Sequence, residues 1–359
     1  MKKHFISIQS LRFLMFLLIF LNHINDYSPL PSFLQSMLCR AGAFSVQFFI
    51  VTSGFLLSYR HIDEYSEALQ IKDMIKTATI KYKKFFPIHI TTFLIAFILY
   101  LFDNINLDGH FFLNAIANVL LIQSYFPDPH IYFGFNAVSW FLSTILLLYL
   151  LYPCILYLIS KYKPSIKVKS VLILFIYCIV FLEAEILMKS SADFVKGIIY
   201  INPLSRLFDF TIGCLLGSIY KDLVKIKLNC KNTSLIEILG FLLSFSSMFL
   251  LSHLQFIPVS FMYVTYFLPY NIILIMIFTL CNGIISKILE NRILTYLGSI
   301  SLYLFMIHQI IIRLMYILLP AFKQRNIGFQ ISVVLLLSIV ISITFDAVSQ
   351  KHKLVKFCR

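Results

Sequence analysis

Long apolar runs alternate with short polar connections along the whole chain. A transmembrane helix needs about 20 apolar residues to cross roughly 30 Å of hydrocarbon. Ten stretches reach or approach this length, and they predict an all-α polytopic membrane protein with ten transmembrane helices, at residues 6–25, 42–59, 82–102, 137–159, 170–188, 203–220, 235–252, 260–282, 295–319 and 327–348. The run at 111–122 is too short to cross, so we expect it to lie at the interface or to re-enter the membrane.

Composition supports the same class of protein. Hydrophobic residues make up 60% of the chain and charged residues 13%, whereas soluble domains are about a quarter charged. The formal charge of +14 would also suit a nucleic-acid-binding protein. Lysine and arginine gather in alternate connections, however, which is the pattern of cytoplasmic loops. We therefore predict cytoplasmic N- and C-termini, a multi-pass location in a bacterial-type cytoplasmic membrane in contact with its lipids, and no nucleic-acid partner.

The chain is expected to form a single membrane domain, residues 1–359, because no linker rich in Gly, Ser or Pro divides it. Lys2 and Lys3 precede the first apolar run as they would in a signal peptide, but no small-residue cleavage site follows. We interpret that run as an uncleaved first helix. The seven cysteines contain no CxxC pair and lie mostly in apolar runs, which predicts neither a disulfide framework nor a metal site.

Charged groups inside a span cost several kcal/mol unless they are paired or hydrated, so each one is a candidate for function. Arg12 and His23 are eleven residues apart in the first predicted helix. That spacing places them on one face, roughly 16 Å apart along the axis. Asp26 follows His23 closely enough to orient its ring. The alternatives are a polar cap for His23 and a snorkelling side chain for Arg12.

Four further stretches carry candidate chemistry, each with a structural alternative. Lys81 and Lys84 stand one turn apart and suit phosphate groups, although taken alone they are better explained by binding of anionic lipid head groups. Trp140, the only tryptophan, is typical of an interfacial belt.

Two more candidates lie in later spans. Arg206 and Asp209 are three residues apart and can pair with each other. His308 lies near the middle of its predicted helix, where a buried histidine bonded to neighbouring helices is as good an interpretation as catalysis.

Together these motifs resemble the acyltransferase-3 family of integral-membrane O-acyltransferases, which modify cell-surface glycans. The resemblance covers nearly the whole chain, through "ISIQSLRFLMFLLIFLNH" at 6–23, "GAFSVQFFIVTSGFLL" at 42–57, "WFLS" at 140–143 with "YP" at 152–153, Arg206 with an acidic residue, Phe and Gly after it, and "LGSISLYLFMIHQ" at 297–309.

The resemblance implies transfer of an acyl group, most often acetyl, from acyl-CoA to a hydroxyl of a cell-surface or lipid-linked glycan. It implies His23 as general base with Asp26 as its orienting group. On this basis we expect the donor to be bound by Lys81, Lys84 and Arg12, with no metal, and the acceptor by Trp140, Ser143, Arg206, Asp209 and His308.

Three departures limit what is carried over. The paired arginines of the family align with Lys81 and Lys84, which keep the charge but lose the bidentate fork. Glutamates often found after the Trp motif are Ile145 and Leu146 here. An acidic residue often found near the end of the last helix is absent. The alternatives are a secondary transporter or glycan flippase built on two halves, or a catalytically inactive scaffold.

Overall fold

The computed structural model describes residues 5–38, 40–65, 69–102, 109–225, 232–253 and 256–357. Lys2, Lys3, Cys39, Cys230 and Cys358, which entered the sequence argument, lie outside the described residues. Within the described ranges all regular structure is helical.

The long helices correspond to the predicted apolar runs. They are α1 Ile6–Asn25, α3 Ala41–His61, α4 Ile71–Phe102, α7 Trp140–Tyr162, α8 Ile166–Ile186, α10 Pro203–Lys225, α11 Thr233–His253, α13 Leu268–Leu280, α16 Ser301–Leu318 and α17 Ile327–Phe357. Shorter helical segments connect them, namely α2 Ser32–Leu38, η1 Ile62–Tyr65, α5 Gly109–Val119, η2 Gln123–Tyr125, α6 Pro129–Tyr132, η3 Ala137–Ser139, α9 Ala192–Val195, η4 Lys196–Ile201, α12 Val259–Val264, α14 Ile284–Leu289, α15 Arg292–Ser299 and η5 Pro320–Gln324.

The prediction of an all-α polytopic membrane protein is confirmed. Eight helical segments in the described part of the chain are long and apolar enough to cross a bilayer. The two predicted spans outside this set are α8 and α10, in which charged residues interrupt the apolar run. The total of ten spans and the cytoplasmic placement of both termini remain predictions.

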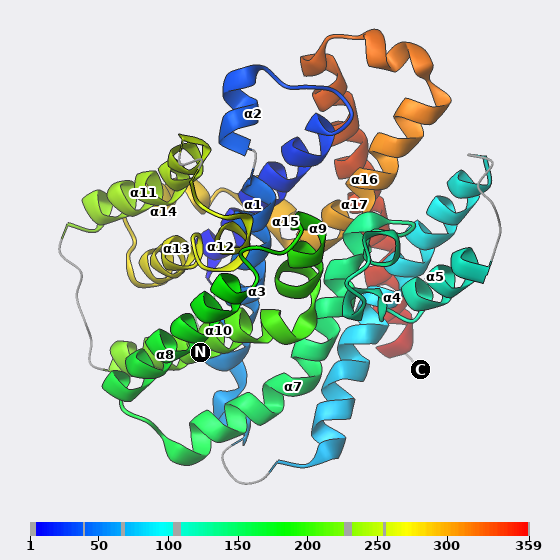
Figure 1. Ribbon diagram of the computed structural model, residues 1–359. Coiled ribbons are helices and arrows are strands. Elements are labelled where there is room, and N and C mark those ends of the chain that lie inside the picture. The colour runs from blue at the N-terminus through cyan, green and yellow to red at the C-terminus, as the bar shows by residue number, and fades with distance from the viewer. Residues whose placement is uncertain are drawn as a thin grey trace.

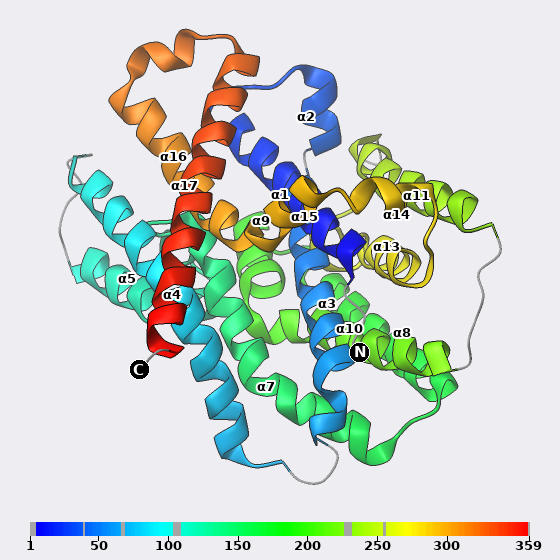
Figure 2. The same cartoon turned by 180° about the vertical axis from the view of Figure 1, so that it is seen from behind.

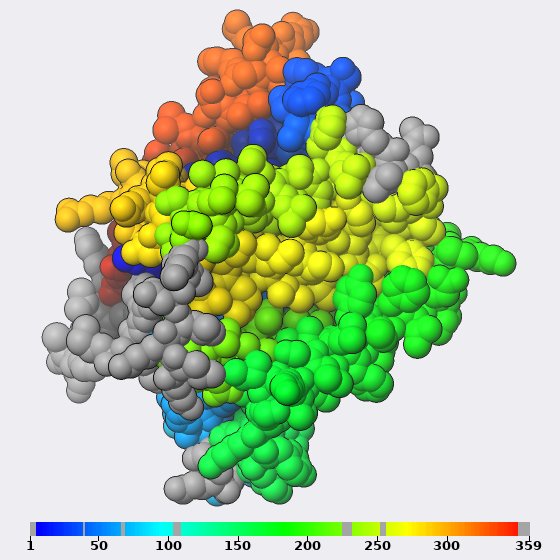
Figure 3. Space-filling view, turned by 90° about the vertical axis from the view of Figure 1, so that its left-hand side faces the viewer, coloured from blue at the N-terminus to red at the C-terminus, as the bar shows by residue number. Residues whose placement is uncertain are grey.

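The outward face of α8 is strongly apolar, which supports its contact with lipid. Large side chains such as Leu174, Phe175 and Leu182 are more than half exposed there. Figure 3 shows α8 in green on this side of the molecule, below the yellow segments of α12 and α13 and the yellow-green α11. Exposed apolar side chains over a whole helix face are what a bilayer-facing surface requires.

Two predicted spans are each broken into two helices, which corrects the sequence interpretation. The span predicted at 260–282 divides into α12 and α13 at residues 265–267, and Pro269 in the first turn of α13 lacks the N–H that a helix continuing through the break would use. The span predicted at 295–319 divides into α15 and α16 at Ile300. There, α15 lies directly on α1, and a Cβ on Gly298 would lie only 1.8 Å from the backbone oxygen of Gln9.

Each of the remaining predicted segments corresponds to a helix in the structure. Helix α4 begins at Ile71, earlier than predicted, and continues through Pro87. The run at 111–122 corresponds to α5, whose 11 residues are too few to cross a bilayer.

Helices α1, α3 and α10 form the centre of the molecule, where α3 packs most extensively against α10. Glycines make this contact close, since a Cβ on Gly54 would lie 2.2 Å from the carbonyl oxygen of Phe210, and one on Gly213 would lie 2.1 Å from that of Val51. Gly213 and Gly217 form the GxxxG spacing that allows membrane helices to approach. Figures 1 and 2 show α11, α13 and α14 on one side of this centre, and α4 and α5 on the other.

Candidate active site

Two cavities lie along the same three helices, α1, α3 and α7. The first, here called the histidine cavity, has a volume of about 300 Å³ and is lined by His23 and Asp26 near the C-terminal end of α1, together with Trp140. The second, here called the cationic cavity, has a volume of about 290 Å³ and is lined by Arg12 on α1 and by Lys81 and Lys84 on α4. The predicted base and the predicted donor-binding cations are thus separated into two chambers.

His23 is bonded to His308 across the contact between α1 and α16. Nδ1 of His23 lies 2.8 Å from Nε2 of His308, and the two rings are parallel to within 1°. His308 is fully buried, and its Nδ1 lies 3.1 Å from the carbonyl oxygen of Leu304, one turn back on α16. The sequence interpretation grouped His308 with the acceptor-binding residues, whereas the structure places it behind His23.

These contacts assign the tautomers of both neutral rings. A carbonyl oxygen only accepts hydrogen bonds, so Nδ1 of His308 carries a hydrogen and Nε2 is an acceptor. Nδ1 of His23 must then donate to His308, which leaves the lone pair of His23 on Nε2. Since His23 lines the cavity and His308 does not, Nε2 of His23 is the nitrogen available to a ligand.

Asp26 lies at the edge of the histidine cavity with Lys196. Although Asp26 remains exposed, the surrounding protein raises the pKa of its carboxyl group, while the Lys196 ammonium opposes that rise. The sequence interpretation made Asp26 the orienting group of His23, whereas Nδ1 of His23 is bonded to His308. Asp26 therefore contributes charge at the cavity rim.

Aromatic side chains form one wall of the histidine cavity. The Trp140 ring centroid lies 5.1 Å from that of Tyr200, which lies 4.9 Å from that of Tyr263. All three side chains line the cavity, and they come from α7, η4 and α12. Such a wall presents broad apolar faces that carry polar edges.

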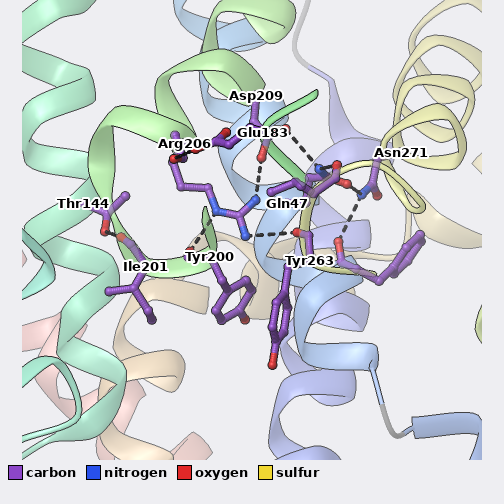
Figure 4. A network of polar contacts seen from close by, with 12 residues as sticks. Gln47, Thr144, Glu183, Tyr200, Ile201, Arg206, Asp209, Tyr263 and Asn271 are labelled. Atoms are coloured by element: carbon purple, nitrogen blue, oxygen red, sulfur yellow. Dashed lines mark hydrogen bonds and ion pairs between the residues drawn. The ribbon is translucent and has the colours of Figure 1, made fainter. Parts of the chain in front are cut away.

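Arg206 and Asp209 lie behind this wall, outside the histidine cavity. Arg206 is fully buried and donates from Nη1 to Asp209 Oδ2 at 2.6 Å, from Nε to the carbonyl oxygen of Tyr200 at 2.8 Å, and from Nη2 to that of Tyr263 at 3.2 Å. Figure 4 shows the two tyrosine rings side by side beneath the guanidinium. Arg206 thus anchors the backbone of two wall residues.

The second carboxylate oxygen of Asp209 accepts a hydrogen bond from α3. Gln47 donates from Nε2 to Asp209 Oδ1 at 3.0 Å, and Asn271 donates to Gln47 Oε1 at 3.3 Å. The sequence predicted that Arg206 and Asp209 can pair, and the structure adds the amides and carbonyls that satisfy both charges (Figure 4).

Ser143 also lies outside the histidine cavity. Its Oγ lies 2.6 Å from Oγ of Ser124, and both side chains are buried. Of the predicted acceptor-binding residues, Trp140 is the one that lines this cavity.

The cationic cavity contains a fourth cation that the sequence interpretation missed. Arg60, near the end of α3, lines it with Arg12, Lys81 and Lys84, and Asp346 is the one carboxylate among the described lining residues. The Lys81 ammonium lies 4.8 Å from the centroid of the Tyr149 ring. This arrangement provides an excess of positive charge suited to a polyanionic ligand.

Helical spacing places Arg60 on the same face of α3 as Phe49, whose position at the cavity only the structure shows. Arg60 is eleven residues after Phe49, so both lie on one face of α3. Phe49 lines the cationic cavity, and the Arg12 guanidinium lies 5.9 Å from the centroid of its ring.

A small cavity lies between these two, and the lining residues that it shares with each mark the passage from one to the other. It has a volume of about 30 Å³, shares Val46 and Phe305 with the histidine cavity, and shares Arg12, Phe49 and Phe141 with the cationic cavity. The two chambers are therefore in line, with Arg12 at one end of the passage.

Comparison with known proteins bears on what this pair of cavities does. The sequence profile described as an acyltransferase domain matches residues 5–347. A stretch of 123 residues is 33% identical to a protein named acyltransferase MdmB from Streptomyces mycarofaciens. That stretch covers 33% of this chain and 30% of the relative, so the chain spans less than a third of that protein. No solved structure matches the chain.

Proposed function

We propose that this chain, which belongs to the acyltransferase-3 family, is a membrane O-acyltransferase that moves an acyl group from acyl-CoA to a hydroxyl of a cell-surface or lipid-linked glycan. Acetyl is the acyl group we favour. One observation carries the proposal: a histidine with an available Nε2 lines a cavity, and a small cavity shares lining residues both with it and with a second chamber rich in cations.

His23 acts as the general base in this proposal. Its Nε2 takes the proton of the acceptor hydroxyl while the hydroxyl oxygen attacks the thioester carbonyl. The new C–O bond forms, the C–S bond breaks, and the departing thiolate receives the proton from His23. An imidazole suits this exchange because its ordinary pKa lies close to neutral pH.

His308 is the positioning residue for the base. It accepts from Nδ1 of His23 and thereby keeps the lone pair on the nitrogen that faces the cavity. In the protonated form of His23, Nδ1–H continues to donate to His308, so the ring need not turn during a cycle.

The cationic cavity binds the donor. The phosphates of coenzyme A carry the negative charge that Arg12, Arg60, Lys81 and Lys84 complement. We place this cavity on the cytoplasmic side, where acyl-CoA is found, and the histidine cavity on the outer side, in a cytoplasmic membrane.

The acceptor binds in the histidine cavity. The wall of Trp140, Tyr200 and Tyr263 provides faces for the apolar side of a sugar ring. Asp26 and Lys196 at the rim supply hydrogen-bonding groups for hydroxyls.

Removing two of the cations tests the donor site. Replacing Lys81 and Lys84 together with alanine is expected to raise the KM for acyl-CoA by roughly tenfold or more, with a smaller change in kcat, because each charge-assisted contact is worth about 1.5–3 kcal/mol. Steady-state kinetics with purified protein measure this. Lys161→Ala, an exposed lysine at the end of α7, is the control. An unchanged KM in the double variant would remove the donor from this cavity.

His308 gives a second test, with a matched pair of variants. His308→Leu removes the acceptor for Nδ1 of His23, and about a 10- to 100-fold loss of kcat is expected, as for other groups that orient a functional histidine. His308→Gln keeps an acceptor oxygen and is expected to recover part of that loss. Equal activity of the two variants would mean that His308 only fills space.

A further inference from the structure

The passage between the two cavities is built almost entirely from apolar side chains. Phe49, Phe141 and Phe305, here called the phenylalanine neck, line it together with Val46 and Leu302. The ring centroids of Phe141 and Phe305 lie 5.5 Å apart, and those of Phe49 and Phe141 lie 6.4 Å apart. The rings come from α3, α7 and α16, so three helices converge on this constriction.

The neck has a far smaller volume than either of the two cavities beside it. Its volume of about 30 Å³ is about a tenth of the 300 Å³ in the histidine cavity, and about 10–15 Å³ of such volume is enough for one water molecule. Among acyl groups, an unbranched chain has the smallest cross-section. A branched or cyclic acyl group therefore meets the rings before its carbonyl reaches His23.

The apolar lining of the neck selects among acyl groups as strongly as its size does. Transfer of a carboxylate from water into an apolar surrounding without a partner is very costly. Arg12 is the one charged residue at the neck and lies at its cationic end, with its guanidinium 5.9 Å from the Phe49 ring centroid. A carboxylate at the tip of an acyl group would be held by Arg12 and the other cations before it entered the neck.

One hydroxyl in the neck has no partner within the protein. Ser301 is 1% exposed, and its Oγ is buried without a hydrogen bond. Buried hydroxyl groups nearly always have partners. In the neck, this hydroxyl is placed to donate to an amide or thioester oxygen of a threaded arm, which agrees with a polar chain passing an otherwise apolar constriction.

We infer that the phenylalanine neck is the acyl-group filter of the enzyme: it admits small, neutral, unbranched acyl groups and rejects branched and carboxylate-bearing ones. This inference rests on the proposed function, since it concerns the route of the same donor. It adds the residues that choose the acyl group, which neither the base nor the phosphate-binding cations determine.

The experiment measures kcat/KM of the purified, full-length protein with acetyl-, propionyl-, isobutyryl- and succinyl-CoA. The parent protein is expected to use acetyl- and propionyl-CoA and to use isobutyryl- and succinyl-CoA at least 100-fold less well. Phe141→Ala is expected to improve the isobutyryl-to-acetyl ratio at least tenfold, because it widens the neck. It should leave succinyl-CoA rejected, because the lining stays apolar.

Two further variants keep the test decisive. Phe305→Leu changes the neck more mildly and is expected to shift the same ratio in the same direction if Phe141→Ala does not fold. Phe175→Ala, on the exposed face of α8, should leave the ratio unchanged.

Each outcome bears on a different claim. Acetyl transfer with unaltered ratios in both neck variants, or efficient use of succinyl- or isobutyryl-CoA by the parent, would overturn the filter while leaving the acyltransferase intact. Failure of the parent to use any of the four donors would overturn the proposed function, and the filter with it.

Discussion

Replacing His23 with alanine is expected to lower acyl transfer by about 10² to 10⁴-fold, the usual contribution of a positioned general base. The acceptor hydroxyl then has no group to take its proton as the C–O bond forms. His23 lines its cavity rather than filling the core, so the protein is expected to insert and fold as the parent does. Acyl transfer to glycan, measured by mass spectrometry of the product, gives the rate.

A matched histidine provides the control. His110 is exposed on α5, and its replacement with alanine is expected to leave transfer unchanged. The amount of folded membrane protein should be equal in all three preparations. Transfer by His23→Ala at the rate of the parent would show that another group accepts the proton.

Replacing Asp209 with alanine is expected to lower the free energy of unfolding by about 3–5 kcal/mol, the range found when one partner of a buried ion pair is removed. Arg206 is fully buried, so its charge would stay inside the protein without the carboxylate to which it is bonded. Gln47 would also lose the oxygen to which it donates. The midpoint of thermal unfolding of the detergent-solubilised protein measures the effect.

Two further variants serve as controls for Asp209→Ala. Asp209→Asn keeps oxygen and size while removing the charge, so its midpoint should lie between those of the alanine variant and the parent. Asp63→Ala removes the exposed partner of Lys221, and exposed pairs contribute little to stability. An Asp209→Ala midpoint equal to that of the parent would mean that the network in Figure 4 contributes nothing to stability.

The helices could be predicted from the sequence because the bilayer imposes their length and apolar character locally. The breaks before α13 and at Ile300 could not be predicted, since apolar content continues across both. The second break depends on the contact of Gly298 with Gln9 on α1. That contact joins residues nearly at opposite ends of the chain.

The candidate site, too, could be predicted from the sequence only in part. Helical spacing alone put Arg12 and His23 on one face, and the structure finds both facing the linked cavities. The bond between His23 and His308 spans 285 residues and follows from the packing of α1 beside α16, which no local pattern encodes.

The rotation of α10 was equally hidden from the sequence. The spacing of Arg206 and Asp209 predicts that they can pair, but not whether the pair faces a ligand or the protein interior. The close contact of Gly54 with α10 fixes that rotation, and it directs the pair away from the histidine cavity.

The continuity of α1 has a consequence for how the chain can change. Because one unbroken helix carries both Arg12 and His23, the distance between the two chambers is set by a rigid rod. Inserting a single residue between them would turn the imidazole by about 100° and lift it by about 1.5 Å. The number of residues between Arg12 and His23 thus sets how far the thioester must extend from the cations to the base. Lengthening α1 by even one residue between them would separate the thioester from its base.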